Sequence, residues 1–340
     1  MGKYLRSNAA LAHSLSIVIP VYRSELIIPL LVQRIINVLE GITESYEIIL
    51  VNDGSPDGSW SVIEKLSSEY PAIRAIDLMR NYGQHNALLA GIRAARYDII
   101  VTMDDDLQHP PEEIPRLLAK LDEGCDVVYG APQKMQHGLL RNLASSITKL
   151  VLQSIMGAET ARNISAYRVF RTSLRAAFAS YSSPSVNIDV LLTWGTRRFS
   201  HIPVTHAPRA AGTSNYTLGK LLVHAVTMIT GFSVWPLRIA SLLGFVMTAF
   251  GLGVLAYVIG VFLILGYSVP GFPFLGSIIA IFSGTQMFIL GMIGEYIARI
   301  HFRTMDQPSY VVRTIIDGKQ SDQYKNFGAH KDRHVTEVGL

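Results

Sequence analysis

Cysteine and charged side chains are both scarce in this sequence. Cys125 is the only cysteine among 340 residues, so no disulfide can form within the chain, and a reducing compartment is permitted. Charged residues make up 16% of the chain, whereas soluble domains carry about a quarter, and the mean hydropathy is +0.29. This apolar content excludes a disordered chain, and it does not fit a single soluble domain.

The shortage of charge is concentrated late in the chain. Arg238 and Glu295 bound a stretch without any Asp, Glu, Lys or Arg, which is long enough for two membrane spans of about 20 residues each. Residues 237–265 and 274–298 are the two candidates, and the Gly- and Pro-containing residues 266–273 form a turn between them. A buried helical hairpin of a large soluble domain is the alternative, although such helices rarely lack all charge over this length.

The basic residues indicate how such a hairpin is oriented. They flank its two outer ends and are absent from the connecting turn, so the positive-inside rule places both ends in the cytoplasm. These residues are Lys220, Arg238, Arg299, Arg303 and Arg313. Residues 1–14 are too polar for a signal peptide, so we expect the domain that precedes the hairpin to stay in the cytoplasm. The net charge of +4 and the pI near 9.1 then indicate contact with anionic lipid, and no nucleic-acid partner is expected.

Residues 15–135 alternate between strand and helix patterns. Short apolar runs predict strands, and helical spacing of apolar or small residues predicts the helices between them. The predicted strands are 16–19, 47–51, 73–78, 98–101 and 126–129, and the predicted helices are 28–39 and 87–95. This alternation predicts an α/β fold with a mostly parallel, doubly wound sheet, whose ligands bind beyond the carboxyl ends of the strands. Polar clusters follow Ile19, Val51 and Met103 at that edge.

Two further elements flank the predicted hairpin. Residues 213–233 place their apolar side chains on one face, which favours an amphipathic helix at the membrane interface, with an ordinary core-facing helix as the alternative. Residues 310–316 have the pattern of an isolated strand, which we expect to join a sheet edge in its own domain or in a neighbouring subunit. The tails 1–14 and 318–340 are polar.

Three consecutive carboxylates, Asp104 to Asp106, follow the fourth predicted strand. They would repel one another without a cation, and alternating residues of an extended segment face the same way, so Asp104 and Asp106 can converge. With Gln108 they offer only oxygen ligands, which suit Mg²⁺ or Mn²⁺ and do not suit zinc. A solvated acidic turn or a helix N-cap is the alternative interpretation of the same residues.

Two other polar segments follow strands. Asp53 comes directly after the second strand, where a carboxylate can accept hydrogen bonds from a base or a ribose, and Gly54 allows a tight turn. Residues 80–85, with the sequence RNYGQH, open a helix whose N-terminus favours an anion. Asx turns, helix caps and a structural His85 are the alternatives. The sequence contains neither the P-loop of nucleoside triphosphatases nor a Ser-His-Asp hydrolase motif.

The combination of these motifs is far more specific than any one of them. PVY at 20–22, VNDGS at 51–55, RNYGQH at 80–85 and DDDLQHPPE at 104–112 resemble family 2 of the inverting glycosyltransferases, in its polyprenyl-phosphate branch. The resemblance extends over about residues 15–316. Further matches are SAYR at 165–168, RAAGTSNY at 209–216, PLR at 236–238 and GMIGEY at 291–296.

The resemblance implies an A-type glycosyltransferase fold, which is Rossmann-like, followed by the amphipathic helix and two transmembrane helices. It also implies a UDP- or GDP-linked sugar as the donor. The divalent cation, Mg²⁺ or Mn²⁺, is expected on Asp104, Asp106 and Gln108. The nucleotide-sugar contacts implied are Pro20, Tyr22 and Asp53, to which we add Asn81, His85 and Asp105.

The acceptor that the resemblance implies is a polyprenyl phosphate, such as undecaprenyl phosphate. A phosphate monoester has a second pKa of about 6, so its attacking oxygen is anionic at cytoplasmic pH and needs no protein general base. Cations must instead offset its repulsion from the donor diphosphate. The expected catalytic residues are Asp104, Asp106, Arg168 and Arg209, with Arg141 and Lys134 as second choices for the acceptor side. Ordinary salt bridges are the alternative role for each of these cations.

Several positions depart from the family pattern. Arg23-Ser24 replaces the usual Asn-Glu with Glu25 displaced by one residue, Asn52 and Arg162 each stand where Asp is usual, and Asn215 replaces a Lys. The metal motif is intact, so these changes bear on the identity of the sugar and the nucleotide and on how the acceptor phosphate is bound.

We therefore expect an enzyme of the bacterial inner membrane, with a cytoplasmic catalytic domain, whose polyprenyl-phosphate sugar serves to modify an envelope glycan such as lipopolysaccharide. The family resemblance favours a homo-oligomer, with a tetramer as the expected form. Transfer to another lipid such as diacylglycerol, and a non-catalytic lipid-sugar transporter or scaffold, are the alternatives.

The expected boundaries are 1–14 for the N-terminal tail, 15–212 for the catalytic domain, 213–233 for the amphipathic helix, 234–300 for the hairpin, 301–317 for the strand region and 318–340 for the polar tail.

Overall fold

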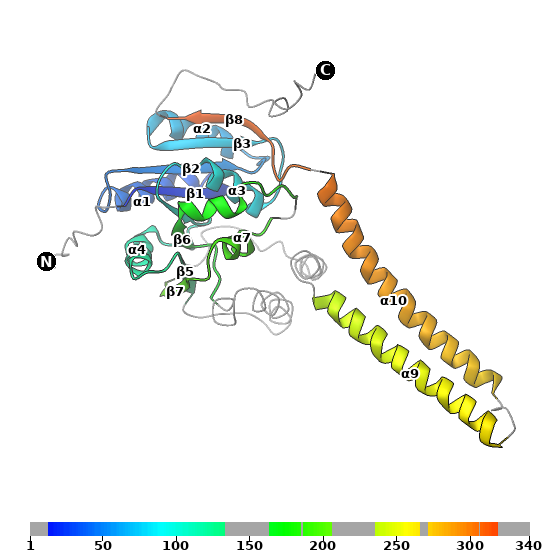
Figure 1. Ribbon diagram of the computed structural model, residues 1–340. Coiled ribbons are helices and arrows are strands. Elements are labelled where there is room, and N and C mark those ends of the chain that lie inside the picture. Colours follow the sequence, from blue (N-terminus) through cyan, green and yellow to red (C-terminus); the bar gives the residue numbers. More distant parts are fainter. Residues whose placement is uncertain are drawn as a thin grey trace, which may run out of the picture. The chain divides into compact units, whose positions relative to one another are not determined.

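The computed structural model describes six segments of the chain (Figure 1). They are residues 13–132, 163–184, 186–205, 235–265, 271–305 and 307–318. The chain divides into two compact units, which are described separately below. The first contains an α/β sheet and includes residues 307–318, and the second contains two long helices.

An eight-stranded mixed sheet forms the first unit. Its strands are β1 (Leu15–Val21), β2 (Tyr46–Asn52), β3 (Ile73–Leu78), β4 (Ile99–Thr102), β5 (Val127–Pro132), β6 (Arg168–Arg171), β7 (Phe199–Val204) and β8 (Val312–Asp317). The order across the sheet is β7-β5-β6-β4-β1-β2-β3-β8. The first four strands are parallel to one another, as the sequence predicts, whereas β6 lies antiparallel to β4 and β8 antiparallel to β3. The sheet is therefore mixed, with its parallel part at the centre.

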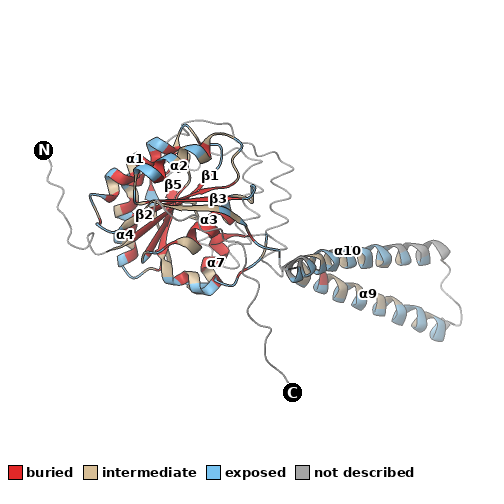
Figure 2. Ribbon diagram, turned by 90° about the horizontal axis from the view of Figure 1, so that it is seen from above, coloured by how far each residue is buried: buried red, intermediate tan, exposed pale blue. Residues whose placement is uncertain are grey.

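Helices cover both faces of this sheet (Figure 2). On one face lie α1 (Ile28–Leu39), α2 (Ser59–Glu69) and α4 (Ile114–Asp122), and on the other lie α3 (Gln84–Ala94), α7 (Ile188–Gly195) and the 3₁₀ helix η3 (Thr172–Phe178). The predicted helix over 28–39 has the observed bounds of α1, because its apolar stripe is fully buried against the sheet. The small residues of α3 allow a close approach: a Cβ on Gly91 would collide with Val18 of β1.

β8 is the strand predicted over residues 310–316, and it occupies the edge of its own sheet. Ala75 of β3 pairs with Ile316, and Ile76 pairs with Ile315, in an antiparallel ladder. Of the two expectations, the structure therefore has the one in which the strand joins its own domain, and not the one in which it joins a neighbouring subunit. The polypeptide therefore leaves the α/β unit after β7, forms the two long helices, and returns to complete the sheet.

The second unit is a pair of helices, α9 (Trp235–Leu265) and α10 (Phe272–Thr304). Residues Pro236–Ile264 and Ile281–Ala298 are long and apolar enough to cross a membrane, by length and composition. Among the side chains that the structure describes in these two segments, only Ala240 is buried. Most of their described residues have the colours for exposed or intermediate burial in Figure 2. The two helices touch where Phe250 stacks on Phe282 at 6.4 Å between ring centroids. Two helices thus lie where the uncharged stretch predicts them.

Some predicted elements lie outside the described residues. They are the amphipathic helix 213–233, residues 266–270 of the connecting turn, residues 1–12 of the N-terminal tail and residues 319–340 of the C-terminal tail.

Candidate active site

The carboxyl ends of β1, β2, β3 and β4 lie side by side at one edge of the sheet, and the loops that follow them carry most of the residues predicted from the sequence. We call this edge the carboxyl edge. Hydrogen bonds join the four loops to one another, as the following contacts show.

The three consecutive carboxylates after β4 have three different partners. Asp104 accepts a hydrogen bond on Oδ1 from Nε2 of Gln84 at 2.5 Å. Asp105 accepts on Oδ2 from the backbone N–H of Tyr22 at 3.1 Å and from another side chain of the β1 loop. Asp106 accepts on Oδ1 from the backbone N–H of Gln108 at 3.1 Å. Each of the three carboxylates is therefore stabilised by a donor of its own.

The backbone of this acidic loop is a bend and not the extended strand expected from the sequence. β4 ends at Thr102, and Leu107 is buried with a left-handed backbone at φ 62°. Left-handed conformations of non-glycine residues are costly and persist where the surroundings enforce them, most often at functional sites. The buried His109 contributes to that enforcement, because its Nδ1 accepts the backbone N–H of Asp104 at 3.2 Å. The relative orientation of Asp104 and Asp106 is therefore set by this bend, and not by the alternation of side chains along a strand.

The donor set of this loop fits a hard divalent cation. Asp104, Asp106 and Gln108 are all half-buried and offer oxygen ligands from one loop. Among the described residues, no three His, Cys, Asp or Glu side chains gather as a group that could hold an ion by themselves. Mg²⁺ and its analogues are commonly bound by one or two carboxylates together with water and substrate phosphates. The residues therefore suit a cation that a phosphate-containing ligand helps to hold.

Asp53 fastens the loop after β3. It is 3% exposed, and its two carboxylate oxygens accept the backbone N–H groups of Tyr82 at 2.7 Å and Gly83 at 2.9 Å. Burial raises the pKa of Asp53, and these two hydrogen bonds act in the opposite direction. Next to it, Gly54 has φ +60°, and a Cβ there would lie 2.5 Å from the backbone carbon of Arg80. Asp53 and Gly54 thus hold residues 80–83 in direct contact with the loop after β2.

Asp105 fastens the loop after β1. Besides Tyr22, its Oδ2 accepts the hydroxyl of Ser24 at 2.6 Å. Burial raises the pKa of Asp105, whereas the hydrogen bonds from Ser24 and Tyr22 lower it. The departures at Ser24 and Glu25 now have structural roles: Ser24 donates to Asp105, and Glu25 Oε2 accepts the backbone N–H of Gly58 at 2.7 Å, just before α2.

The remaining predicted nucleotide-sugar residues differ in accessibility. Pro20 is buried in β1, beyond the residues that pair with β4, so its missing N–H removes no hydrogen bond from that ladder. Tyr22 is 42% exposed, and Asn81 is also exposed. His85 is half-buried, and its Nδ1 accepts the backbone N–H of Ile188 at 3.3 Å, at the start of α7. Tyr22 and Asn81 are thus accessible to a ligand, while His85 connects two helices.

Arg168 lies in the core. It is 2% exposed in β6, its Nε donates to the carbonyl of Ser165 at 3.2 Å, and its Nη1 lies 3.5 Å from Oδ1 of Asp189. Asp189 is itself 5% exposed and accepts the hydroxyl of Tyr129 at 3.1 Å. This placement does not favour the predicted role of Arg168 at the acceptor phosphate, because its guanidinium is paired and removed from solvent.

Other residues singled out in the sequence lie outside the described part of the chain. They are Arg209, the second-choice cations Lys134 and Arg141, and the departures Arg162 and Asn215.

Sequence reasoning missed Gln84 and His109, which hold the acidic loop from outside and from within it. Both lie within the motifs RNYGQH and DDDLQHPPE, which by themselves indicate no role for either residue. A signal was available for Gln84, since it is the first residue of a helix that begins at the carboxyl edge. No sequence signal identifies the acceptor role of His109 toward the backbone of Asp104.

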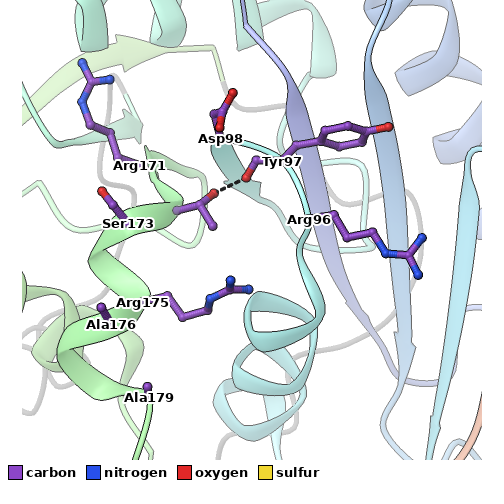
Figure 3. A pocket seen from close by; sticks show the side chains of 9 residues that line it. Arg96, Tyr97, Asp98, Arg171, Ser173, Arg175, Ala176 and Ala179 are labelled. Carbon is purple, nitrogen blue, oxygen red and sulfur yellow. Dashed lines mark hydrogen bonds between the residues drawn. The ribbon is translucent and has the colours of Figure 1, made fainter.

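A cavity of about 500 Å³ lies at the opposite, amino end of β4 (Figure 3). Its lining includes Arg96, Arg171 and Arg175. These arginines already have partners: Arg96 pairs with Asp317, and Arg175 donates to three backbone carbonyls at the end of α3. The cavity is therefore separate from the carboxyl edge, and its cations serve to join β8, α3 and η3.

Comparison with known proteins relates this arrangement to a family. The family model described as Glycosyl transferase family 2 matches residues 16–175, which extend from β1 into η3. The undecaprenyl-phosphate 4-deoxy-4-formamido-L-arabinose transferases of Salmonella choleraesuis and Salmonella typhimurium are each 37% identical to this chain over 312 residues. The matched region covers 91% of this chain and 95% of each relative.

Solved structures are also similar to this chain. A mycobacterial protein is 19% identical with a TM-score of 0.50, over 65% of this chain and 74% of that one. A glucosyl-3-phosphoglycerate synthase from Mycobacterium tuberculosis, in complex with Mn²⁺, UDP and phosphoglyceric acid, is 19% identical with a TM-score of 0.49, over 64% and 77% of the two chains. With its mixed sheet and its match to the family model over the α/β unit, the chain is a glycosyltransferase of family 2, with the A-type fold, and it belongs to the polyprenyl-phosphate branch.

Proposed function

We propose that this enzyme transfers one sugar, with inversion, from a nucleoside diphosphate to undecaprenyl phosphate. The observation that carries the proposal is the 37% identity to undecaprenyl-phosphate sugar transferases over 91% of the chain, which includes both long helices as well as the α/β unit. A lipid acceptor also accounts for the presence of apolar helices in a chain whose catalytic loops lie in an α/β unit. The product is a polyprenyl-phosphate sugar for modifying an envelope glycan.

In this proposal the acidic loop holds the donor diphosphate through a divalent cation. Asp104, Asp106 and Gln108 provide the protein ligands, and both Mg²⁺ and Mn²⁺ suit this oxygen donor set. When bound, the cation supplies positive charge that stabilises the departing diphosphate. Gln84 and His109 hold Asp104 in place by hydrogen bonds to its side chain and backbone.

The nucleotide lies in the proposal along the loops after β1, β2 and β3. The exposed Tyr22 and Asn81 are the side chains best able to contact it directly. Asp53 and Asp105 act beside them by fixing the loops, because their carboxylates already accept backbone N–H groups. Pro20 and His85 support the same edge from β1 and α3. A UDP-linked and a GDP-linked sugar are both compatible with these contacts.

No protein general base is needed in the proposed reaction. The acceptor phosphate is already mostly anionic near neutral pH, since its second pKa is about 6. Asp105, the remaining carboxylate of the cluster, accepts two hydrogen bonds on one oxygen and serves to hold the β1 loop. Because Arg168 is buried, the acceptor-side positive charge is assigned to Arg209, with Arg141 and Lys134 behind it, all of which lie outside the described residues.

The enzyme is placed, in the same proposal, in the bacterial inner membrane as a homo-oligomer. The uncharged turn between α9 and α10 faces the outside, and the basic outer ends with the α/β unit face the cytoplasm. A tetramer is the expected assembly, and β8 pairs with β3 of its own sheet. Native mass spectrometry of the purified full chain in detergent tests the assembly: a monomer would overturn it.

Thin-layer chromatography of lipid products tests the transfer itself. The full chain is incubated with Mn²⁺, undecaprenyl phosphate and one of a panel of radiolabelled UDP- and GDP-sugars, with Asp106→Asn as the control. Label that enters the lipid phase only when undecaprenyl phosphate is added supports the proposal. Label on diacylglycerol would show that diacylglycerol, and not undecaprenyl phosphate, is the acceptor. Absence of labelled lipid with every donor would favour a transporter or scaffold.

A further inference from the structure

The strand that follows α10 completes the sheet beside the candidate donor loops (Figure 1). β8 runs antiparallel to β3, so its first residues lie at the carboxyl edge of the sheet. Its last residue, Asp317, lies opposite Arg74 at the other end of β3. One end of β8 is therefore close to the loop after β3, and the other end is remote from it.

The ladder between β3 and β8 is irregular at the carboxyl edge. Thr314 pairs with Asp77, whereas Leu78 pairs with Val312, so Arg313 has no partner across the ladder. A β-bulge of this kind bends the strand and redirects the side chain of the extra residue, and bulges occur frequently next to active sites. Here the redirected side chain is an arginine.

Arg313 binds two groups on β3 and the loop after it. Its Nη1 donates to Oδ2 of Asp77 at 3.0 Å, and its Nη2 donates to the carbonyl of Met79 at 3.0 Å. The backbone N–H of Met79 in turn donates to the carbonyl of Val311 at 2.9 Å. Both backbone polar groups of Met79, where the loop begins, are therefore held by residues at or just before the start of β8.

Asp77 extends this contact to the loop after β2. It is 2% exposed, and its other oxygen accepts Nδ2 of Asn52 at 2.7 Å. Asn52 Oδ1 accepts the backbone N–H of Ser55 at 3.2 Å. Within the described part of the chain, Arg313 is the only cation paired with Asp77. The departure at Asn52 is consistent with this chain of contacts, since an Asp there would set a second carboxylate against a buried one.

The loop of residues 79–83 is thus fastened at both ends. Arg313 and Val311 hold its start, and Asp53 holds its last two backbone N–H groups. Between these points the exposed Asn81 is the residue proposed to contact the nucleotide. A ligand-binding loop that is fixed at two ends loses less conformational freedom on binding, so its affinity depends on both fastenings.

We propose that Arg313 is a positioning residue of the donor site, which fixes the loop 79–83 and the turn after β2 through Asp77 and Met79. The proposal rests on the proposed function, because it concerns the loop assigned to the nucleotide. It makes the strand that follows the second apolar helix a working part of the donor site, in addition to an edge of the sheet.

The test compares Arg313→Ala with Asp317→Asn in the full chain in detergent. Asp317 pairs with Arg74 and Arg96 at the far end of the same strand, so its loss weakens the docking of β8 without reaching the loop. Binding of UDP and of GDP, each with Mn²⁺, is measured by titration calorimetry, and amide hydrogen exchange is followed at residues 79–83. Arg313→Lys is the conservative variant, since its ammonium can reach one of the two acceptors.

Arg313→Ala is expected to weaken binding of the nucleotide by roughly tenfold or more and to speed exchange at residues 79–83. Asp317→Asn should retain the wild-type affinity and the wild-type exchange rates at residues 79–83, even if its melting temperature falls as far as that of Arg313→Ala. Arg313→Lys should recover part of the affinity. Unchanged affinity and exchange in Arg313→Ala, or equal losses in Asp317→Asn, would overturn the inference alone. Wild-type protein that binds neither UDP nor GDP would overturn the proposed donor site and the inference with it.

Discussion

The guanidinium of Arg168 lies 3.5 Å from the carboxylate of Asp189, and both side chains are almost completely buried. A charge pair of this kind is not in itself strongly stabilising, but removal of one partner leaves the other charged and unpaired in the core. Among the described residues, Nη1 of Arg168 has no hydrogen-bond partner, and the ion pair with Asp189 compensates its charge.

Arg168→Ala is therefore expected to act mainly on stability. Loss of the cation beside Asp189 should lower the free energy of unfolding by about 3–5 kcal/mol, measured by denaturant unfolding of the full chain in detergent. Arg116→Ala is the matched control, because Arg116 is 56% exposed and pairs with Glu113 on the surface, where the change should be within about 1 kcal/mol. A stable but inactive Arg168→Ala enzyme would instead restore the role at the acceptor phosphate predicted from the sequence.

Asp106→Asn should lower turnover by about 10²–10³-fold while the protein stays folded. The acidic loop is expected to hold the cation that stabilises the departing diphosphate, and that stabilisation is strongest in the transition state. Product formation is measured by chromatography, and Glu69→Gln, a change at an exposed carboxylate of α2, serves as the control. Excess EDTA should abolish activity, and added Mn²⁺ or Mg²⁺ should restore it. Full activity in EDTA would refute the metal assignment.

Gly54→Ala should be more harmful than expected from the left-handed backbone conformation of Gly54 alone, because the new Cβ would also collide with a donor loop. Gly54 has φ +60°, and its new Cβ would lie 2.5 Å from the backbone of Arg80. Gly124→Ala is a close control, because Gly124 has φ +102° but nothing within 4 Å of a new Cβ. We expect Gly124→Ala to cost about 1–2 kcal/mol of stability, and Gly54→Ala to cost more and to weaken binding of UDP or GDP as well. Equal effects of the two changes would show that the contact with Arg80 is unimportant.

Acid should weaken the fold partly through Asp126. Burial alone would raise the pKa of Asp126, but hydrogen bonds from Arg198 and Thr196, with the charges of Arg198 and Arg171, lower it below its usual value. A carboxyl group whose pKa is lower in the folded state stabilises the protein above its unfolded pKa of about 3.9, and this contribution disappears as the pH falls through the folded pKa. Asp126→Asn should therefore melt below wild type at pH 7, and the difference should narrow below about pH 4. A difference that stays constant with pH would contradict the linkage.

Thiol labelling can establish the topology. In a Cys125→Ser background, cysteines are introduced singly at Ser268, between α9 and α10, and at Ser68, an exposed residue of α2. An impermeant maleimide applied to intact cells should label position 268 and spare position 68, because the basic outer ends keep the α/β unit inside. Both positions should react in permeabilised cells. Labelling of position 68 alone in intact cells would reverse the proposed orientation.

The elements that the sequence predicts are those whose signal is local. The stripe of α1 is visible in the spacing of Ile28, Leu31 and Ile35, and the burial of β1 is visible in its continuous apolar run. β6 was not predicted, because it has only four residues with an arginine at each end, and its burial comes from strands that are distant in the sequence.

The roles within the site depend on contacts that no local pattern encodes. Asp105 and Tyr22 are 83 residues apart in the chain, and Arg313 and Asp77 are 236 apart. The motifs therefore indicated which loops gather at the carboxyl edge, but they did not indicate which carboxylates would be occupied by backbone N–H groups. Arg168 illustrates the same limit, because a buried arginine and an exposed one look alike in a sequence.

The position of β8 at the end of the chain determines when the sheet can be finished during synthesis. β3 leaves the ribosome long before β8, and both apolar helices are made in between. Until residue 317 has been made, the edge of β3 has unpaired N–H and C=O groups, and such an edge readily pairs with other strands. The final strand therefore closes this edge only after both helices have been synthesised, so a chain whose synthesis stops before β8 would expose an aggregation-prone sheet edge.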